Sequence, residues 1–370
     1  MKTIHLGMIG SGHVSDRYFE QAAMLEGVRF VATCSRSLEN ARRKAAAHQV
    51  PRWYDDYREM MDKEELDAVV VTTPHSAHAE PVLAALERGL HVLNEKPMAT
   101  SFEDCQRMVR LAEEKQAVFL SLPFDLHPAL LAAAEFVDER YIGKITGAEA
   151  QLSLQGPWRD NWYYDKTIAH GGAVLDCLVY PVSRLIALLG PAVSVMAEVN
   201  TLIPKRIVGG GKKVMSDVDD NVTVIVEFQG GQHAVIRTLW GMSFKQNNTL
   251  IYGRNGTVAL NDSGFPLVIH SPGQALLDAE KVIWRGIDEC YVPHGTIASF
   301  PNEPVMAHFV TCVRSGVHPV QSGRQQLHVH EILFGAYRSA ETGKRYELST
   351  TFTSWNKRKS GIFDTRSEFL

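Results

Sequence analysis

Short apolar runs alternate with amphipathic segments over the first 122 residues of the chain. The run Ala68-Val69-Val70-Val71 is typical, because it is entirely apolar and is followed by helical periodicity from 79 to 88. Short apolar strands alternating with helices indicate a parallel sheet that is covered on both faces. The pattern predicts strands at 4–9, 28–34, 68–71, 91–93 and 117–122, and helices at 16–25, 38–48, 79–88 and 102–115.

The pattern changes after Pro123, where runs with strand character become more frequent. Residues 229–231, Gln-Gly-Gly, predict a tight turn between two of these runs. The stretch 204–216, which contains three consecutive glycines, is expected to be a mobile loop. The expected strands are 148–154, 193–199, 222–228, 233–239, 249–252 and 257–260, and the expected helices are 128–140, 172–189, 305–314 and 324–341.

These patterns predict an α/β protein of two domains. A doubly wound parallel sheet is expected at 1–122, an α+β domain with a large, mostly antiparallel open sheet at 123–347, and a C-terminal tail at 348–370. The second domain has too few predicted helices to cover both faces of its sheet. Since monomers avoid large exposed apolar patches, we expect a homodimer or homotetramer formed through this sheet.

Composition narrows the class of protein. The 370 residues are 45% hydrophobic with a formal net charge of −4, which gives no reason to expect nucleic acid or an anionic membrane as partner. The basic run 357–359 is short and is expected to be solvated. No apolar run reaches the roughly 20 residues of a membrane helix. Five dispersed cysteines and the lack of a signal peptide indicate reduced thiols in a cytoplasm.

A glycine-rich turn follows the first predicted strand. In Gly10-x-Gly12-x-x-Ser15, the first glycine allows a tight turn and the second lets the backbone approach a pyrophosphate. The small third residue permits close packing of helix on strand, and the N–H groups of the helix N-terminus then face the phosphates. This context favours dinucleotide binding over the alternative of a plain turn between strand and helix.

The end of the second predicted strand indicates which dinucleotide is bound. An acidic residue there would hydrogen-bond the ribose 2′-hydroxyl of NAD, but the sequence has Ser35 and Arg36 instead. Both residues suit a 2′-phosphate, so NADP(H) is the favoured cofactor and NAD(H) the alternative. In the other interpretation Arg36 is only a solvated residue at a helix start.

Three residues supply acid–base chemistry. Lys96 directly follows a predicted strand, and ligands bind at the C-terminal ends of the strands in a doubly wound sheet. Asp176 and Tyr180 stand at i and i+4 of a predicted helix, so they share one face of it. Free tyrosine has a pKa of about 10, and a nearby lysine is expected to lower the pKa of Tyr180. In the alternative interpretations, Lys96 is a surface lysine, and the helix of Asp176 and Tyr180 is a capped helix with a buried tyrosine.

An aromatic segment follows the predicted strand at 148–154. It contains Trp158, Trp162, Tyr163 and Tyr164, with Arg159 and Asn161 between them. This mixture suits stacking on a sugar as well as a packed loop.

Several histidines could be taken for metal ligands. His75 and His78 are separated by two residues, and His328 and His330 by one, so the second pair diverges on a helix. No cysteine or acid stands near them at zinc-like spacing, and we expect no metal site. His75 and His78 are expected to line or support the cofactor pocket.

The chain resembles the glucose–fructose oxidoreductase/inositol dehydrogenase (Gfo/Idh/MocA) family. The matching elements are the glycine turn, Thr-Pro-His-Ser-Ala-His at 73–78, the segment 89–97 ending in Glu95-Lys96-Pro97, Trp158-Arg159, and 171–180. The resemblance spans roughly 3–347, and Tyr180 stands where many members have histidine. It implies a Rossmann domain joined to a domain whose open sheet mediates oligomers.

The resemblance also implies an activity, namely NAD(P)-linked hydride transfer at a hydroxyl or carbonyl carbon of a sugar, sugar derivative or polyol. Lys96, Asp176 and Tyr180 would be catalytic. The residues expected to bind cofactor are Gly10, Gly12, His13, Val14, Ser35, Arg36, Thr73, Pro74, His75, His78, Glu95, Lys96 and Arg159. The residues expected to bind substrate are Lys96, Trp158, Arg159, Trp162, Tyr163, Asp176 and Tyr180.

Two alternatives remain beside the dehydrogenase. One is a glycoside-cleaving enzyme that holds its nicotinamide tightly and oxidises the sugar only transiently; net cofactor turnover distinguishes it. The other is a non-catalytic protein that senses a sugar or nucleotide. Members of that kind tend to lose the lysine of Glu-Lys-Pro, and this chain keeps Lys96.

Overall fold

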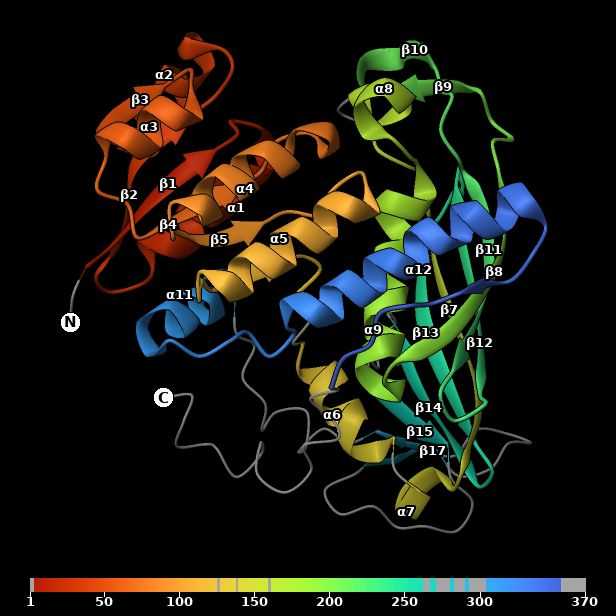
Figure 1. The fold of residues 1–370 in the computed structure, drawn as a ribbon. Helices are drawn as coiled ribbons and strands as arrows, with labels where there is room; N and C mark the ends of the chain where they lie inside the picture. The colour runs from red at the N-terminus through yellow and green to blue at the C-terminus, as the bar shows by residue number, and fades with distance from the viewer. Residues whose placement is uncertain are drawn as a thin grey trace.

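The computed structural model describes residues 3–124, 127–137, 139–158, 161–261, 267–270, 280–282, 290–292 and 304–353. Two large sheets organise these residues. Figure 1 shows the N-terminal sheet with its helices on one side and the long strands of the second sheet on the other, with helices α9 (Val179–Leu189) and α12 (Gly323–Thr342) between them. The predicted two-sheet α/β architecture is confirmed.

The first sheet is parallel throughout and has the strand order β3-β2-β1-β4-β5-β6. Its central strand β4 is buried along its whole length, as expected for a strand that is covered on both faces. The strands are β1 (Ile4–Ile9), β2 (Val28–Cys34), β3 (Arg52–Tyr54), β4 (Ala68–Val71), β5 (His91–Asn94) and β6 (Phe119–Ser121). The helices are α1 (His13–Ala23), α2 (Leu38–Ala47), α3 (Tyr57–Lys63), η1 (His75–Ala77), α4 (Ala79–Glu87) and α5 (Phe102–Glu114).

The second sheet has ten strands in the order β16-β17-β15-β14-β13-β7-β12-β11-β8-β18. All neighbouring pairs are antiparallel except β7 and β12, so the sheet is mixed but mostly antiparallel, as predicted. The strands are β7 (Ile145–Leu154), β8 (Ala192–Asn200), β11 (Asn221–Phe228), β12 (His233–Trp240), β13 (Gln246–Gly253), β14 (Gly256–Asn261), β15 (Leu267–His270), β16 (Glu280–Val282), β17 (Cys290–Val292) and β18 (Tyr346–Glu347).

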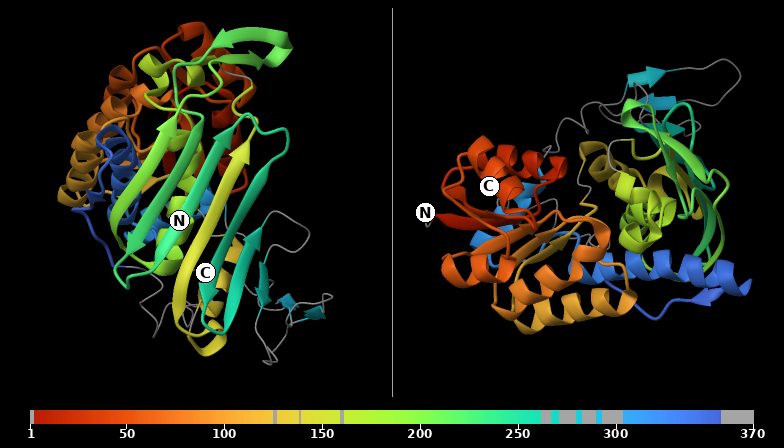
Figure 2. Two further views of the ribbon diagram at one scale, coloured as in Figure 1. Left: turned by 90° about the vertical axis from the view of Figure 1, so that its right-hand side faces the viewer. Right: turned by 90° about the horizontal axis from the view of Figure 1, so that it is seen from above.

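In the part of the chain that the structure describes, helices cover one face of this sheet. The core between sheet and helices includes Val182 of α9, Val329 of α12 and Ala133 of α6 (Pro128–Phe136) together with strand residues such as Val224. Figure 2, left, shows the opposite face as a broad surface of strands with no helix in front of it. Further helical segments among the described residues of this half are α7 (Glu139–Ile142), η2 (Asn161–Tyr164), α8 (Lys166–Ala169), a π-helical turn, η3 (Val174–Leu178), and η4 (Gly209–Gly211).

Helix α11 (Val305–Ser315) packs against the N-terminal sheet, although it comes late in the sequence. Val305, Met306 and Phe309 belong to the same buried cluster as Leu6 of β1 and Tyr18 of α1. The N-terminal unit that holds the dinucleotide turn is therefore completed by residues from near the C-terminus. We propose that this unit comprises the predicted 1–122 together with α11.

The stretch expected to be a mobile loop forms a hairpin instead. Strands β9 (Lys205–Val208) and β10 (Lys212–Met215) pair antiparallel, and the glycines 209–211 make the turn between them. Alternation explains the hairpin: Arg206 and Val208 are buried against the domain, while Ile207 points outward and is 70% exposed. The prediction of a loop is wrong because the glycine run dominated the sequence signal.

Among the described residues, one helical stretch, Lys166–Leu189, is long and apolar enough by length and composition to cross a membrane, but 78% of its apolar window is buried inside the protein. Burial explains its composition, because core helices are apolar around their circumference.

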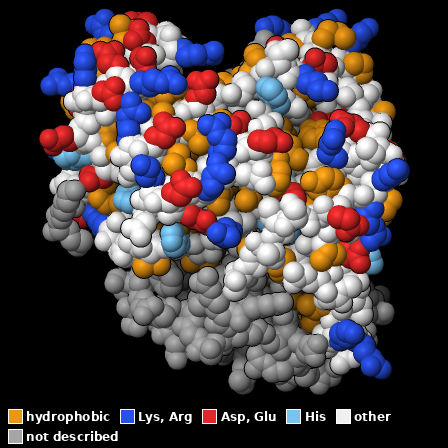
Figure 3. All heavy atoms as spheres, viewed as in Figure 1, with side chains coloured by type: hydrophobic (Ala, Val, Ile, Leu, Met, Phe, Trp, Pro, Cys, Tyr) orange, Lys and Arg blue, Asp and Glu red, His pale blue; other side chains and the backbone are white. Residues whose placement is uncertain are grey.

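In Figure 3, basic and acidic side chains are interspersed over the described part of the face shown, without an extended patch of one sign.

Candidate active site

A pocket of about 360 Å³ lies where the dinucleotide turn faces the second domain. His13 lines it from the start of α1, and Asp176 from the π-helical turn. The wall between them comes from the end of β7 and the segment after it. Pockets of this size hold small molecules. The other lining residues are Leu154, Gly156, Pro157, Trp158 and Tyr163.

Lys96 and Asp176 form an ion pair across the two domains. The Lys96 Nζ donates a hydrogen bond to the Asp176 carboxylate and another, 3.1 Å long, to its main-chain carbonyl oxygen. Each side chain is only 12% exposed. Burial alone would lower the pKa of Lys96, but Asp176 and the tyrosines Tyr180 and Tyr163 hold it well above its usual value. Against the effect of burial, Lys96 lowers the pKa of Asp176, so both groups are charged at neutral pH.

Tyr180 joins this pair from the first turn of α9. The Lys96 Nζ lies over the Tyr180 ring, 5.5 Å from its centroid, and the Tyr180 side chain is 37% exposed. The expectation that Lys96 would bring the pKa of Tyr180 below its usual value is wrong. Burial raises this pKa, and although Lys96 lowers it, Glu95 and Asp176 raise it further, so the net shift is upward.

The helix that carries Asp176 is held at its start by Asp219. The Asp219 carboxylate accepts hydrogen bonds from the Gly172 N–H at 2.8 Å, the Val174 N–H at 2.7 Å and the Tyr337 hydroxyl at 2.6 Å. A Cβ atom at Gly172 would lie 1.9 Å from the Asp219 carbonyl oxygen, and one at Gly171 would lie 2.1 Å from the Tyr337 hydroxyl. Only glycine fits at these two positions, which brings the helix start directly onto the second sheet.

Asp176 itself lies in a π-helical turn rather than in the regular helix that the sequence predicted. Such turns are frequent at functional sites. The second carboxylate oxygen of Asp176 accepts a contact from the Cys177 thiol at 3.4 Å, and the indole N–H of Trp240 donates to the Cys177 sulfur at 3.2 Å. Both oxygens of Asp176 are therefore engaged, and its orientation toward Lys96 is fixed.

Glu95 bonds to two side chains of helix α1. Its carboxylate accepts a hydrogen bond of 2.6 Å from the Tyr18 hydroxyl and lies 3.8 Å from the Arg17 guanidinium. The Lys96-Pro97 peptide bond that follows is cis. Tyr18 and Arg17 are contacts that sequence reasoning missed, since neither belongs to a recognisable motif.

The glycine turn fits a dinucleotide pyrophosphate. Gly10 has φ +113°, and a Cβ atom there would lie 2.7 Å from the backbone of Thr72. A Cβ atom at Gly12 would meet no described atom within 4 Å, so the space in front of the α1 N-terminus is open. The Ser15 hydroxyl donates to the Gly12 carbonyl oxygen at 2.7 Å, which explains serine at the third small position. Phosphates are bound well at such helix starts.

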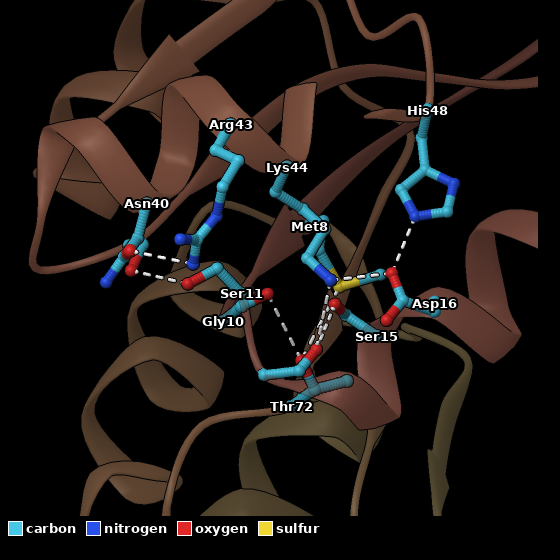
Figure 4. A network of polar contacts seen from close by, with 12 residues as sticks. Met8, Gly10, Ser11, Ser15, Asp16, Asn40, Arg43, Lys44, His48 and Thr72 are labelled. Atoms are coloured by element: carbon cyan, nitrogen blue, oxygen red, sulfur yellow. Dashed lines mark hydrogen bonds and ion pairs between the residues drawn. The ribbon is translucent and has the colours of Figure 1, made fainter. Parts of the chain in front are cut away.

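A second set of contacts fixes this turn against α2, as Figure 4 shows. The Lys44 ammonium bonds the Asp16 carboxylate at 2.6 Å and the Gly12 carbonyl oxygen at 3.3 Å, and His48 reaches the same Asp16 oxygen at 2.6 Å. Burial raises the pKa of Asp16, but its bonds to Lys44 and His48 outweigh this and lower it. Sequence reasoning missed this cluster because its members lie on two different helices.

Ser35 and Arg36 lie beside the turn, at the end of β2. The Ser11 hydroxyl donates to the Ser35 hydroxyl at 2.8 Å, which places Ser35 directly at the glycine turn. Arg36 is exposed and makes no hydrogen bond or ion pair with the residues that the structure describes.

The two histidines of the segment after β4, His75 and His78, are buried. The His75 ring donates a hydrogen bond from Nδ1 to the Ala169 carbonyl oxygen at 3.1 Å, and burial lowers the pKa of His75 to about 3. His78 lies between the carbonyl oxygens of Pro97 at 2.7 Å and Thr73 at 2.8 Å. Both histidines therefore bond to main-chain carbonyl oxygens of segments next to the site. Thr73 and Pro74, by contrast, are half-buried.

The aromatic segment contributes to the pocket in part. Trp162 and Tyr163 stack at 3.8 Å between ring centroids, and both meet the His75 ring edge-on. Trp158 is 57% exposed and lines the pocket, with the N–H of Gly209 at the hairpin tip donating to its carbonyl oxygen at 2.5 Å. Arg159, expected to contact both cofactor and substrate, lies outside the described residues.

Among the described residues, no group of three or more His, Cys, Asp or Glu side chains is arranged to hold a metal ion. The histidines that could be taken for ligands in the sequence bond to main-chain and hydroxyl groups instead.

Comparison with known proteins agrees with this geometry. A family model described as "Oxidoreductase family, NAD-binding Rossmann fold" matches residues 4–122, and a second, "GFO/IDH/MocA C-terminal domain", matches 130–259. Levoglucosan dehydrogenase of Pseudarthrobacter phenanthrenivorans is 26% identical over 299 residues, which is 70% of this chain and 74% of that protein.

Two further comparisons cover more of the chain. D-xylose 1-dehydrogenase (NADP(+)) 2 of Haloferax volcanii is 26% identical over 346 residues, covering 92% of this chain and 99% of that protein. The solved structure of levoglucosan dehydrogenase in complex with NADH and L-sorbose aligns with a TM-score of 0.79 and 22% identity, covering 95% of this chain and all of that one. At that identity the structural match establishes the shared fold.

Proposed function

This chain belongs to the GFO/IDH/MocA family of oxidoreductases, and we propose that it is an NAD(P)-dependent dehydrogenase or reductase acting on a hydroxyl or carbonyl carbon of a sugar, sugar derivative or polyol. The observation that carries the proposal is the meeting of Lys96, Asp176 and Tyr180 beside a pocket that opens onto the dinucleotide turn. A bound nicotinamide would supply or accept the hydride there.

The protein side chains would handle the proton. In this proposal the Lys96 ammonium donates to the reacting substrate oxygen and stabilises negative charge on it. Tyr180 exchanges the hydroxyl proton. Asp176 keeps Lys96 charged and holds its ammonium beside the pocket through one carboxylate oxygen, while the Cys177 thiol engages the other oxygen. Trp158 and Tyr163 would hold the apolar face of the sugar at the opposite wall.

A spectroscopic assay tests the proposal directly. Nicotinamide absorbance would be followed with NADP and NAD across a panel of aldoses, sugar acids, inositols and glycosides. Steady net reduction of the cofactor with at least one polyol or sugar is the expected result. Glycoside cleavage without net cofactor turnover would favour transient oxidation instead. Binding without either reaction would contradict an enzymatic role.

We expect NADP(H) to be preferred over NAD(H). Arg36 is exposed beside the glycine turn, and it makes no hydrogen bond or ion pair with the residues that the structure describes. A charge-assisted hydrogen bond is worth about 1.5–3 kcal/mol. Arg36→Ala should therefore raise the Michaelis constant for NADP roughly tenfold to a hundredfold and leave that for NAD nearly unchanged. Steady-state kinetics with both cofactors measures this.

Arg29→Ala is the matched control, since Arg29 is an exposed arginine at the opposite end of the same strand. It should change neither constant. A wild-type preference for NAD, or an Arg36→Ala variant with unchanged NADP kinetics, would contradict the assignment of NADP.

We also propose a homo-oligomer formed through the uncovered sheet face. On β8, β11 and β12, Met196, Ile225 and Val235 lie directly opposite one another in the register and are each more than 40% exposed. The same row continues to the half-buried Leu250 on β13, interrupted by Glu149 on β7. An apolar stripe across neighbouring strands is the kind of surface that a second subunit covers.

Light scattering at micromolar concentration should therefore give the mass of a dimer or tetramer. Ile225→Lys places a charge in the middle of the stripe and should shift the protein toward monomer. Val317→Lys is the control, because Val317 is also an exposed apolar residue, 56% exposed, but lies after α11 and outside the sheet. A monomeric wild type would contradict this interface.

For the cellular setting we propose the cytoplasm. Cys34, Cys105 and Cys177 are free and buried. Unpaired, dispersed cysteines are typical of a reducing compartment.

A further inference from the structure

Helix α12 carries the motif His328-Val329-His330-Glu331, in which all three polar side chains are fully buried. Each of them bonds to a different part of the molecule. Glu331 accepts four hydrogen bonds from the N–H and hydroxyl groups of Ser349 and Thr350, between 2.5 and 2.8 Å long. The two histidines bind main-chain N–H groups, one near the active site and one distant from it.

His330 is bonded at both ring nitrogens. Its Nδ1 lies 2.7 Å from the Gln326 carbonyl oxygen, which can only accept, so Nδ1 carries the proton. Its Nε2 is then a lone-pair acceptor, and it receives the N–H of Met98 at 2.7 Å. Burial lowers the pKa of His330 to about 4, and the imidazole is therefore neutral at neutral pH, as this arrangement requires.

Met98 lies two residues after Lys96, in the turn that leaves β5. Three side chains hold this turn: the Asn94 amide donates to the Met98 carbonyl oxygen at 2.9 Å, the His78 ring contacts the Pro97 carbonyl oxygen at 2.7 Å, and His330 accepts the Met98 N–H. Asn94 and His78 belong to the same domain as the turn. His330 comes from α12, which packs against both α5 and α9.

We propose that His330 is a positioning residue that fixes the Lys96 turn at the distance from α9 where the Lys96 ammonium meets Asp176. Lys96 stands on the first domain and Asp176 on the second, so their contact depends on how the domains are aligned. The Met98–His330 hydrogen bond is a direct contact of the second domain with the backbone of the turn that carries Lys96. This inference rests on the proposed function of Lys96.

His328 provides a matched control on the same helix. It is equally buried, its pKa is likewise lowered by burial to about 4, and its Nε2 accepts a main-chain N–H, that of Ala192, at 3.0 Å. Its Nδ1 contacts the Thr350 hydroxyl at 2.8 Å. Ala192 begins β8, on the far side of α12 from the Lys96 turn, so a His328 variant loses similar bonds without touching that turn.

Two substitutions separate the two bonds of His330. His330→Gln keeps an acceptor near the position of Nε2 and should retain activity within a few-fold of wild type. His330→Asn keeps a donor near Nδ1 but cannot reach Met98, and should lower kcat roughly tenfold to a hundredfold, as expected for a misplaced catalytic group. The Michaelis constant for the cofactor should stay nearly unchanged, because the glycine turn is not involved. His328→Asn should lose about as much thermal stability as His330→Asn, but it should keep the kcat of the wild type.

A second readout does not depend on turnover. Trace acetylation of lysines at pH 8, followed by peptide mass spectrometry, measures how well Lys96 is protected by its ion pair. His330→Asn should accelerate Lys96 acetylation several-fold, and His328→Asn and His330→Gln should not. If the proposed oxidoreductase function is wrong, wild type shows no turnover but this pattern of protection persists.

The proposal is overturned if His330→Asn and His328→Asn lose kcat and Lys96 protection equally, or if neither changes. It is also overturned if His330→Gln behaves like His330→Asn, because the acceptor at Met98 would then be irrelevant. Failure of both His330 variants to fold, with His328→Asn folded, would assign His330 to core stability and remove it from positioning.

Discussion

Lys96→Met is expected to lower the turnover number by roughly 10²–10³-fold, the usual effect of removing one group that stabilises charge on a reacting oxygen. Lys96 is the only one of the three proposed catalytic residues that is positively charged. Cofactor binding should persist, because the glycine turn and Ser35 lie apart from Lys96. The measurement is kcat for nicotinamide reduction, together with cofactor affinity from fluorescence titration.

The same substitution should destabilise the fold, since it leaves the Asp176 carboxylate buried without its cation. Removing one partner of a buried ion pair costs about 3–5 kcal/mol. The double variant Lys96→Met with Asp176→Asn should regain much of that stability and no activity, which separates the two effects. Lys63→Met is the control, because Lys63 is 62% exposed in a surface pair with Glu59. Near wild-type turnover in Lys96→Met would exclude Lys96 from the chemistry.

Tyr180→Phe is expected to lower turnover by roughly 10²–10⁴-fold, the range for a general acid–base group. The ring is kept, so the contact with Lys96 and the helix packing remain, and stability should hardly change. Tyr57→Phe is the control, because it removes the hydroxyl of another partly exposed tyrosine on the first domain.

The pH dependence follows from the raised pKa of Tyr180 in the free protein. Alcohol oxidation needs the phenolate as proton acceptor, so kcat/KM should rise with pH and level off only above the ordinary value of about 10. Carbonyl reduction needs the phenol, so its kcat/KM should stay flat and fall only above that same pKa. Tyr180→Phe should lose both limbs. If it keeps the wild-type rate and profile, the proton is carried elsewhere, with Lys96 or Tyr163 as the next candidates.

Hydrophobic patterns predicted the strands of the first domain correctly where these strands are short and wholly apolar, as at Ala68–Val71. Several elements were missed, and for some of them the reason is physical: β3 is three residues long and lies at a sheet edge, and the two strands of the β9–β10 hairpin are half polar. Helix α1 begins at His13, three residues earlier than predicted, because Gly12 in extended conformation forms its N-cap. The predicted helix 128–140 ends at Phe136, and α7 follows separately from Glu139.

For the site, motif reasoning selected Lys96, Asp176 and Tyr180, which the structure brings together. It could not give the direction of the Tyr180 pKa shift, because that depends on burial by segments distant in sequence. It also could not find Asp219 or His330, whose contacts with Gly172 and Met98 span 47 and 232 residues. Such partners carry no local signature, since a single aspartate shortly before a predicted strand, or a single histidine in a predicted helix, looks like many others.

Helix α11 has a consequence for how this protein is made. During synthesis the strands and helices of the first 122 residues leave the ribosome long before Val305–Ser315. Until then the surface of Leu6 and Tyr18 lacks the side chains of Met306 and Phe309, and an apolar area stays uncovered. N-terminal domains commonly fold first during translation. Here the core of the N-terminal unit is complete only after α11 in the last third of the chain has been synthesised. A fragment that ends at residue 122 would expose that apolar area permanently.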